Sequence, residues 1–78
     1  MNAAEARAKL TQNMSQNTDK DYPLVWVGDM IEETPEAFIF EATVYKEHEN
    51  PRDDYLDWAV DKATGSVSVV NFEWVPPL

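Results

Sequence analysis

The stretch that decides the fold is "VDKATGSV", residues 60–67, because its composition is that of a tight turn between two strands. Asp61 can accept hydrogen bonds from the backbone N–H groups that follow it. Gly65 can take the left-handed conformation that closes such a turn. Segments with the pattern of strands lie on both sides. The stretch therefore predicts a β-hairpin, and its structural turn residues are Asp61, Thr64 and Gly65.

The segments on either side of this turn read as its two strands. "YLDWAV" alternates in polarity and predicts a strand over residues 55–61. Its expected inward residues are Leu56, Trp58 and Val60. "SVSVVNFEW" predicts a partner strand over residues 66–74, and its phase changes near Val69 and Val70, which indicates either a bulge or a strand with both faces covered. The tail "VPPL" cannot continue a ladder, because its two prolines lack N–H donors.

Two further strands are expected earlier in the chain. "EAFIFEATVYK", residues 36–46, has the alternation of a half-buried strand. Its expected inward residues are Phe38, Phe40, Ala42 and Val44. "PLVWV", followed by Gly28, predicts a strand over residues 23–28. The segment "IEETPE", residues 31–36, contains Pro35 and suits the connection between these two strands.

The N-terminal segment is the one predicted helix. "AAEARAKLTQNMS", residues 3–15, is rich in helix formers and has neither Gly nor Pro. One apolar stripe follows the helical spacing, and it consists of Ala3, Ala6, Leu10 and Met14. The chain of 78 residues is long enough for one domain over 1–78. We expect an α+β fold in which one N-terminal helix packs on a four-stranded antiparallel β-meander.

The charge is strongly acidic and unevenly distributed. The net charge is −9, and residues 29–57 hold ten acids against two bases. The sign disfavours direct binding to nucleic acid and favours a basic protein partner, although acidity can also serve solubility alone. There is no cysteine and no apolar run of membrane-spanning length, which predicts a cytoplasmic protein without a membrane segment. A mature fragment of a secreted protein would look the same.

The helix-then-sheet order, together with "LDWAVDKATGSV", residues 56–67, resembles PepSY-like domains and is similar to small bacterial immunity-protein domains. The last hairpin of those families carries an apolar-x-apolar-Asp-x-x-Thr-Gly-x-Val pattern. Its positions are filled here by Trp58, Val60, Asp61, Thr64, Gly65 and Val67. Ser66 stands where an acidic residue is common. The resemblance implies a non-enzymatic domain that binds or restrains another protein.

The loop "EHENPRDD", residues 47–54, surrounds the only histidine with carboxylates, but its pattern fits neither metal nor catalytic chemistry. Zinc sites use several Cys or His ligands, and a calcium loop would place a glycine where this loop has Pro51 and Arg52. We therefore expect no metal, no cofactor and no enzymatic activity. Arg52 is expected to pair with one of the loop's carboxylates and to hold the turn.

The candidate partner-binding residues are the acids of this loop, one further acid and one C-terminal tryptophan: Glu47, Glu49, Asp53, Asp54, Asp57 and Trp74. Trp74 could instead cap the open face of the sheet. The leading hypothesis is a small protein that inhibits or neutralises a basic protein partner. The alternatives are a nucleic-acid mimic that occludes a DNA- or RNA-binding protein, and a structural or oligomerising module. A monomer is expected.

Overall fold

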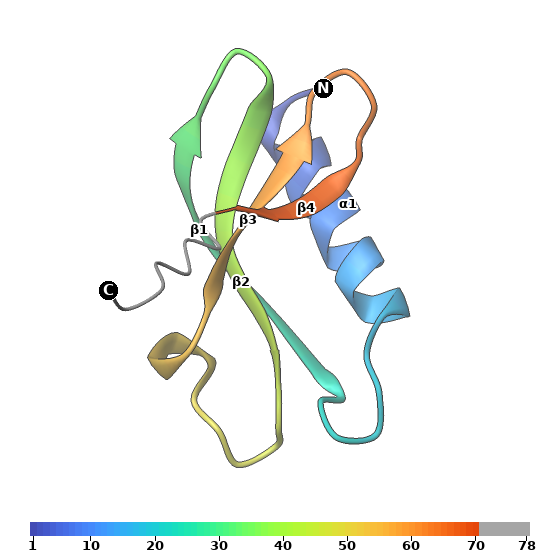
Figure 1. Ribbon diagram of the computed structural model, residues 1–78, viewed down its shortest axis with the longest axis vertical. Coiled ribbons are helices and arrows are strands. Elements are labelled where there is room, and N and C mark those ends of the chain that lie inside the picture. The colour runs from blue at the N-terminus through green and yellow to red at the C-terminus, as the bar shows by residue number, and fades with distance from the viewer. Residues whose placement is uncertain (71–78) are drawn as a thin grey trace, which may run out of the picture.

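The structure, a computed structural model, describes residues 1–70 and has one helix against an open four-stranded sheet (Figure 1). The elements in chain order are α1 (Ala3–Gln16), β1 (Leu24–Glu33), β2 (Ala37–Tyr45), the short 3-10 helix η1 (Pro51–Asp53), β3 (Leu56–Asp61) and β4 (Val67–Val70). All neighbouring strands are antiparallel, and their order in the sheet is β1-β2-β3-β4. The predicted α+β fold, with one helix on an antiparallel meander, is confirmed.

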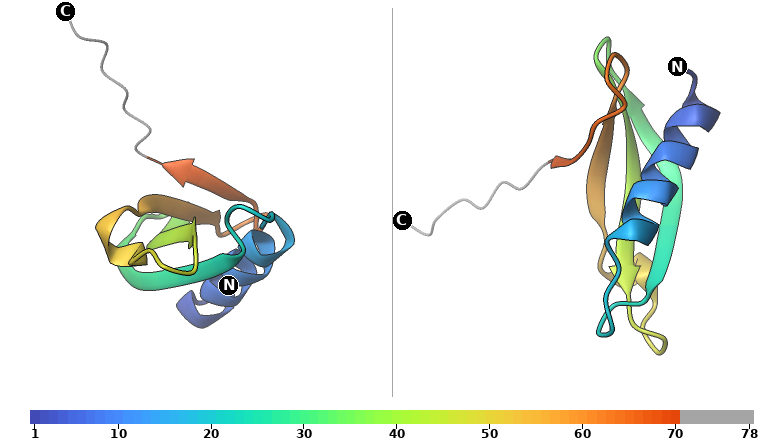
Figure 2. Two further views of the ribbon diagram at one scale, coloured as in Figure 1. Left: turned by 90° about the horizontal axis from the view of Figure 1, so that it is seen from below. Right: turned by 90° about the vertical axis from the view of Figure 1, so that its right-hand side faces the viewer.

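Helix α1 lies across one face of the sheet (Figure 2). It buries one stripe of side chains against that face. The helix begins at Asn2, which forms a capping box: its side chain accepts from the backbone N–H of Glu5, and the Glu5 carboxylate accepts from that of Asn2. Ala6, Leu10 and Met14 are buried, which confirms the predicted stripe.

The core lies between α1 and the inner face of the sheet, by which we mean the face toward the helix. The strands contribute four buried side chains, Phe38, Phe40, Ala42 and Val60. Full burial of a Leu, Phe or Val side chain stabilises the fold by about 1.5–3 kcal/mol. These few buried side chains therefore supply most of the hydrophobic stabilisation that a domain of this size has.

Strand β1 is longer than predicted, since it runs over Leu24–Glu33 instead of 23–28. The pairing with β2 continues beyond Gly28 because two irregularities absorb extra residues, one between Val27 and Met30 and one between Met30 and Glu32. The turn itself is short. The Thr34 hydroxyl accepts from the backbone N–H groups of the two residues that enter β2, at 3.2 and 2.9 Å.

The predicted hairpin between β3 and β4 is confirmed in detail. The Asp61 carboxylate accepts from the backbone N–H groups of Ala63 and Thr64 at 2.8 and 2.9 Å. These two bonds, that of Thr64 first, hold the pKa of Asp61 below its ordinary value of 3.8. Gly65 closes the turn with a φ of +75°, the left-handed region that glycine favours.

Two details of the last two strands differ from expectation. Leu56 pairs with Ala42 of the inner face, as predicted, but is 43% exposed, and Ala59, predicted outward, pairs with Ile39 and is only 8% exposed. Strand β4 pairs regularly with β3, so the bulge considered near Val69 is absent there, and Val69 and Val70 are both half-buried. The rest of the predicted strand 66–74, including Trp74, lies outside the described residues.

Candidate functional site

The sheet face turned away from α1 is the main surface that no described element covers (Figure 2). Val25 and Val27 pack against the core, so Trp26 points to the opposite side by strand alternation. We call this side the outer face, and its central residues on β1 to β3 are Trp26, Ile39, Glu41, Thr43, Asp57 and Ala59. An aromatic ring, carboxylates and half-buried apolar side chains are therefore combined on one side of the sheet.

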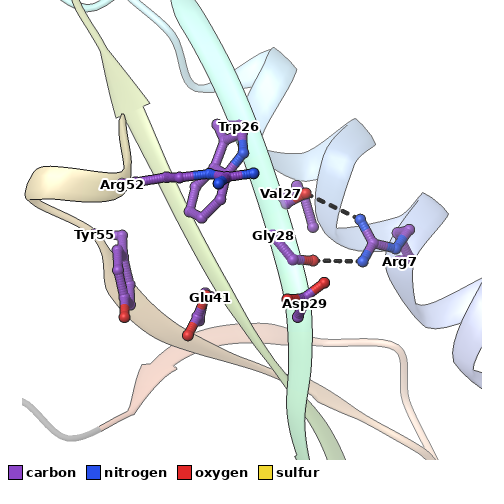
Figure 3. Close-up of a pocket in the computed structure, with 8 residues that line it drawn as sticks. All are labelled: Arg7, Trp26, Val27, Gly28, Asp29, Glu41, Arg52 and Tyr55. Atoms are coloured by element: carbon purple, nitrogen blue, oxygen red, sulfur yellow. Dashed lines mark hydrogen bonds between the residues drawn. The ribbon is translucent and has the colours of Figure 1, made fainter. Parts of the chain in front are cut away.

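Beside β1 the surface is hollowed, with a volume of about 450 Å³. We call this the outer hollow, and it is lined by Arg7, Trp26, Val27, Gly28, Asp29, Glu41, Arg52 and Tyr55 (Figure 3). Two aromatic rings form its apolar part: the centroids of Trp26 and Tyr55 are 5.8 Å apart, and the ring planes are inclined by 55°. Such a tilted aromatic pair is a favourable arrangement and adds a rigid apolar wall.

Gly28 sets the position of the Trp26 indole. A Cβ atom at residue 28 would lie 2.5 Å from Cη2 and 2.7 Å from Cζ2 of the ring. The indole therefore lies directly over the glycine and has room only because a side chain is missing there. The spacing Trp-x-Gly within a strand was the available sequence signal, because residues two apart share a face.

Glu41 connects the aromatic wall to the centre of the sheet. The hydrogen bond between Tyr55 and the Glu41 carboxylate raises the pKa of Tyr55 above 10.0, and the negative charge of Glu41 acts in the same direction. Glu41 is also directly opposite Asp57 in the register of β2 and β3. Like charges in that position destabilise a sheet. The outer face thus holds a concentrated negative charge.

Arg52 does not form the ion pair that was predicted. Among residues 1–70 its guanidinium lies within 4 Å of no carboxylate oxygen. The turn is held instead by Asn50, whose side chain accepts from the Arg52 backbone N–H at 3.1 Å. The Arg52 side chain extends from this turn into the outer hollow, on the side of Trp26 (Figure 3). The neutral side chain of Asn50 therefore holds the turn at Arg52, and the Arg52 guanidinium lies at the outer face of the sheet.

Arg7 closes the other end of the outer hollow and joins α1 to the edge of the sheet. Its guanidinium donates to the carbonyl of Val27 at 3.0 Å and to that of Gly28 (Figure 3). It also lies 5.4 Å from the centroid of the Phe40 ring. The irregularity after Val27 explains how two consecutive carbonyls can face one guanidinium, since successive carbonyls of a regular strand point in opposite directions. Sequence reasoning missed this contact.

The predicted binding residues do not form one cluster. Glu47, Glu49, Asp53 and Asp54 are exposed on the connection between β2 and β3. Glu49 folds back on that loop, where its carboxylate accepts from the Lys46 backbone N–H at 3.1 Å. Asp57 lies apart from them on the outer face. Trp74 is outside the described residues, so it stays a candidate from sequence alone.

Two classes of site can be assessed for residues 1–70. Within that range no group of three His, Cys, Asp or Glu side chains is arranged to hold a metal ion. No described helix has the length and apolar character needed to cross a bilayer.

No family model, curated protein or solved structure matches the chain. The resemblance to PepSY-like and immunity-protein domains therefore stays a prediction, based on the order of elements and on the hairpin at Asp61, Thr64 and Gly65.

Proposed function

We propose that this protein is a non-catalytic domain that binds a basic protein partner through its outer face and inhibits or neutralises that partner. The observation that carries the proposal is the pair Glu41 and Asp57, directly opposite each other near the centre of the sheet. Like charges directly opposite each other are unfavourable for a sheet. A positively charged partner surface placed over the two carboxylates would offset their mutual repulsion and be attracted to both.

Among residues 1–70, one ion pair joins a cation to a carboxylate. Lys62 pairs with Glu33 at 2.7 Å, far from the outer face near the turn between β1 and β2. Arg7 is directed at backbone carbonyls. The net charge of −9 therefore acts outward, and the association rate with a basic protein is raised at low ionic strength.

The shape of the domain supports the same function. A sheet with one covered face offers the other as a rigid surface, and half-buried Trp26 and Ile39 supply apolar contact area beside the charges. Aromatic residues near the centre of a contact are the side chains that most often dominate binding energy. Electrostatic attraction would bring the partner in, and the apolar residues would hold it.

The test is capture of a partner on immobilised protein from the host's lysate at 50 and 500 mM salt. Three proteins are compared: wild type, an outer-face variant with Glu41→Gln and Asp57→Asn, and a loop variant in which Glu47, Glu49, Asp53 and Asp54 are all changed to their amides. We expect wild type and the loop variant to retain a basic protein at low salt, and the outer-face variant to lose it.

The other outcomes are equally informative. Loss in the loop variant alone would move the contact to the acidic loop. Capture that high salt leaves unchanged would contradict an electrostatic interaction. If added DNA or RNA displaces the captured protein, the partner is a nucleic-acid-binding protein, and the protein acts as the mimic considered above.

A further inference from the structure

We propose that the outer hollow is the site that receives one arginine side chain of the basic partner, and that the protein's own Arg52 occupies it until the partner displaces it. This inference rests on the proposed function and assigns its central contact. Three features of the hollow carry it: the aromatic wall, the charge balance of the lining, and the weak attachment of Arg52.

The aromatic wall suits a planar cation. Trp26 is held over Gly28, and Tyr55 stands beside it with a ring centroid 5.8 Å away. A guanidinium stacks on the face of an indole, which is the most favourable ring for a cation–π contact. Arginine fits better than lysine here, because its planar group can stack on the ring and donate to a carboxylate at the same time.

The charges that line the outer hollow allow one cation, that of Arg52, to be exchanged for a cation of the partner. Two carboxylates, Asp29 and Glu41, and two guanidiniums, those of Arg7 and Arg52, line the outer hollow. Arg7 is fixed by its hydrogen bonds to the β1 carbonyls. Glu41 lies in the lining close to Tyr55, whose pKa it raises. Replacing Arg52 by a partner's arginine preserves this balance, whereas adding a second cation beside Arg52 would not.

Arg52 is attached only weakly. In residues 1–70 the structure shows an ion pair at Lys62 but none at Arg52, and the hydrogen bond of Arg52 is made by its backbone N–H. It follows Pro51 on the exposed turn η1, which the capping side chain of Asn50 holds independently of the Arg52 guanidinium. The side chain can therefore leave the hollow without any loss of backbone hydrogen bonding.

This arrangement predicts that removing the Arg52 charge increases the binding affinity. Removing a binding residue normally weakens binding, but Arg52→Gln should tighten it, because the competing cation is gone. Lys46→Gln is the matched control, since it removes one positive charge near the same loop, where Lys46 lies over the Tyr22 ring and not in the outer hollow. Any effect of net charge alone is the same in both variants.

The probe is the peptide acetyl-Gly-Arg-Gly-amide, with the citrulline peptide as its neutral counterpart of nearly the same shape. Binding is followed by the indole and backbone N–H signals of the ¹⁵N-labelled protein during titration. We expect the arginine peptide to shift Trp26 and Tyr55. The indole N–H of Trp58 donates to the Ala42 carbonyl at 3.0 Å and serves as the internal reference that does not move.

We expect the citrulline peptide to bind about tenfold more weakly than the arginine peptide. Arg52→Gln should bind the arginine peptide about fivefold more tightly than Lys46→Gln does, a factor equivalent to about 1 kcal/mol. Gly28→Ala should abolish the shift at Trp26, because the new methyl group displaces the indole. Urea unfolding of each variant shows that it is folded.

The inference is overturned by equal binding of the two peptides, by no shift at Trp26, or by weaker binding in Arg52→Gln. The last result, together with binding of an acetyl-Gly-Asp-Gly-amide peptide, would make Arg52 an anion ligand instead. These failures leave the proposed function intact if the lysate partner is still captured in a salt-dependent way. Loss of capture with binding of the arginine peptide retained would instead reject the proposed function alone.

Discussion

Arg7 is the side chain whose removal tests most directly how the helix is joined to the sheet. The perturbation is Arg7→Met, which keeps the length and helix propensity of the side chain and removes its charge and donors. It eliminates two hydrogen bonds to the carbonyls of Val27 and Gly28 and the contact with the Phe40 ring. The control is Lys9→Met, two residues further along α1, which changes the net charge equally. The Lys9 side chain forms no hydrogen bond or ion pair with residues 1–70 in the structure.

The magnitude follows from the contacts. Hydrogen bonds from a charged group contribute about 1.5–3 kcal/mol when sheltered, but Arg7 is exposed, so both together are reduced to about 1–2 kcal/mol. The cation–π contact adds about 0.5–1 kcal/mol. The sum of about 1.5–3 kcal/mol is a large part of the roughly 3–5 kcal/mol available to a domain of this size.

The assay is urea unfolding followed by far-ultraviolet circular dichroism. With an m-value of about 1 kcal/mol/M, the Arg7→Met midpoint should fall about 1.5–3 M below that of wild type. The Lys9→Met midpoint should stay close to wild type. If the two variants unfold at the same urea concentration, the guanidinium does not stabilise the β1 edge, and the reasoning is refuted.

Three further predictions concern the core and the two titrating groups with shifted pKa values. Leu10→Ala should destabilise the fold by about 2–5 kcal/mol, so its urea midpoint, followed by circular dichroism, should fall far below that of wild type; a cooperative transition near the wild-type midpoint would contradict the described core. The pKa of Tyr55 is raised in the folded state, so its contribution to stability is complete below pH 10 and is lost as the pH rises through the folded pKa. Wild type should therefore lose more stability than Tyr55→Phe between pH 8 and 11. In the Glu41→Gln variant the pKa of Tyr55, measured by NMR titration of a ring carbon, should return toward 10. The pKa of Asp61 is lowered in the folded state, so its contribution to stability is present above pH 3.8 and is lost as the pH falls through the folded pKa. Asp61→Asn should therefore be less stable than wild type at pH 7 but equal to it at pH 2. A difference in stability that stays constant with pH would show that the negative charge of Asp61 does not stabilise the turn.

The features that the sequence predicted correctly depend on residues close together in the chain. The hairpin at Asp61 and Gly65 is made by side-chain and backbone groups within five residues. The stripe of α1 and the alternation of β2 repeat within a single element. Local spacing is enough to fix all three, because each follows from the period of a helix, a strand or a turn.

The features that were missed depend on distant residues. The second half of β1 carries exposed acids, and it is a strand only because irregular pairing with β2 supports it. The contact from Arg7 to Val27 spans 20 residues. The outer hollow needs Trp26, Glu41, Arg52 and Tyr55 from different segments, and no periodicity within one segment reports which of them meet.

The order of the strands also determines when each part of the protein finds its contacts during synthesis. Because β1 to β4 pair with their chain neighbours, each hairpin can close as soon as its own segment has left the ribosome. Helix α1 emerges first, yet its buried residue Leu10 packs in a core that includes Val60. At about 5–20 residues per second, the 50 residues after Leu10, up to and including Val60, take roughly 2.5–10 s to be added. Until β2 has emerged, the apolar side of the helix has no sheet to cover it, and that side is limited to a stripe of a few small and flexible side chains on an otherwise polar helix. Packing on Phe38 and Phe40 can then precede the arrival of Val60, which completes the core.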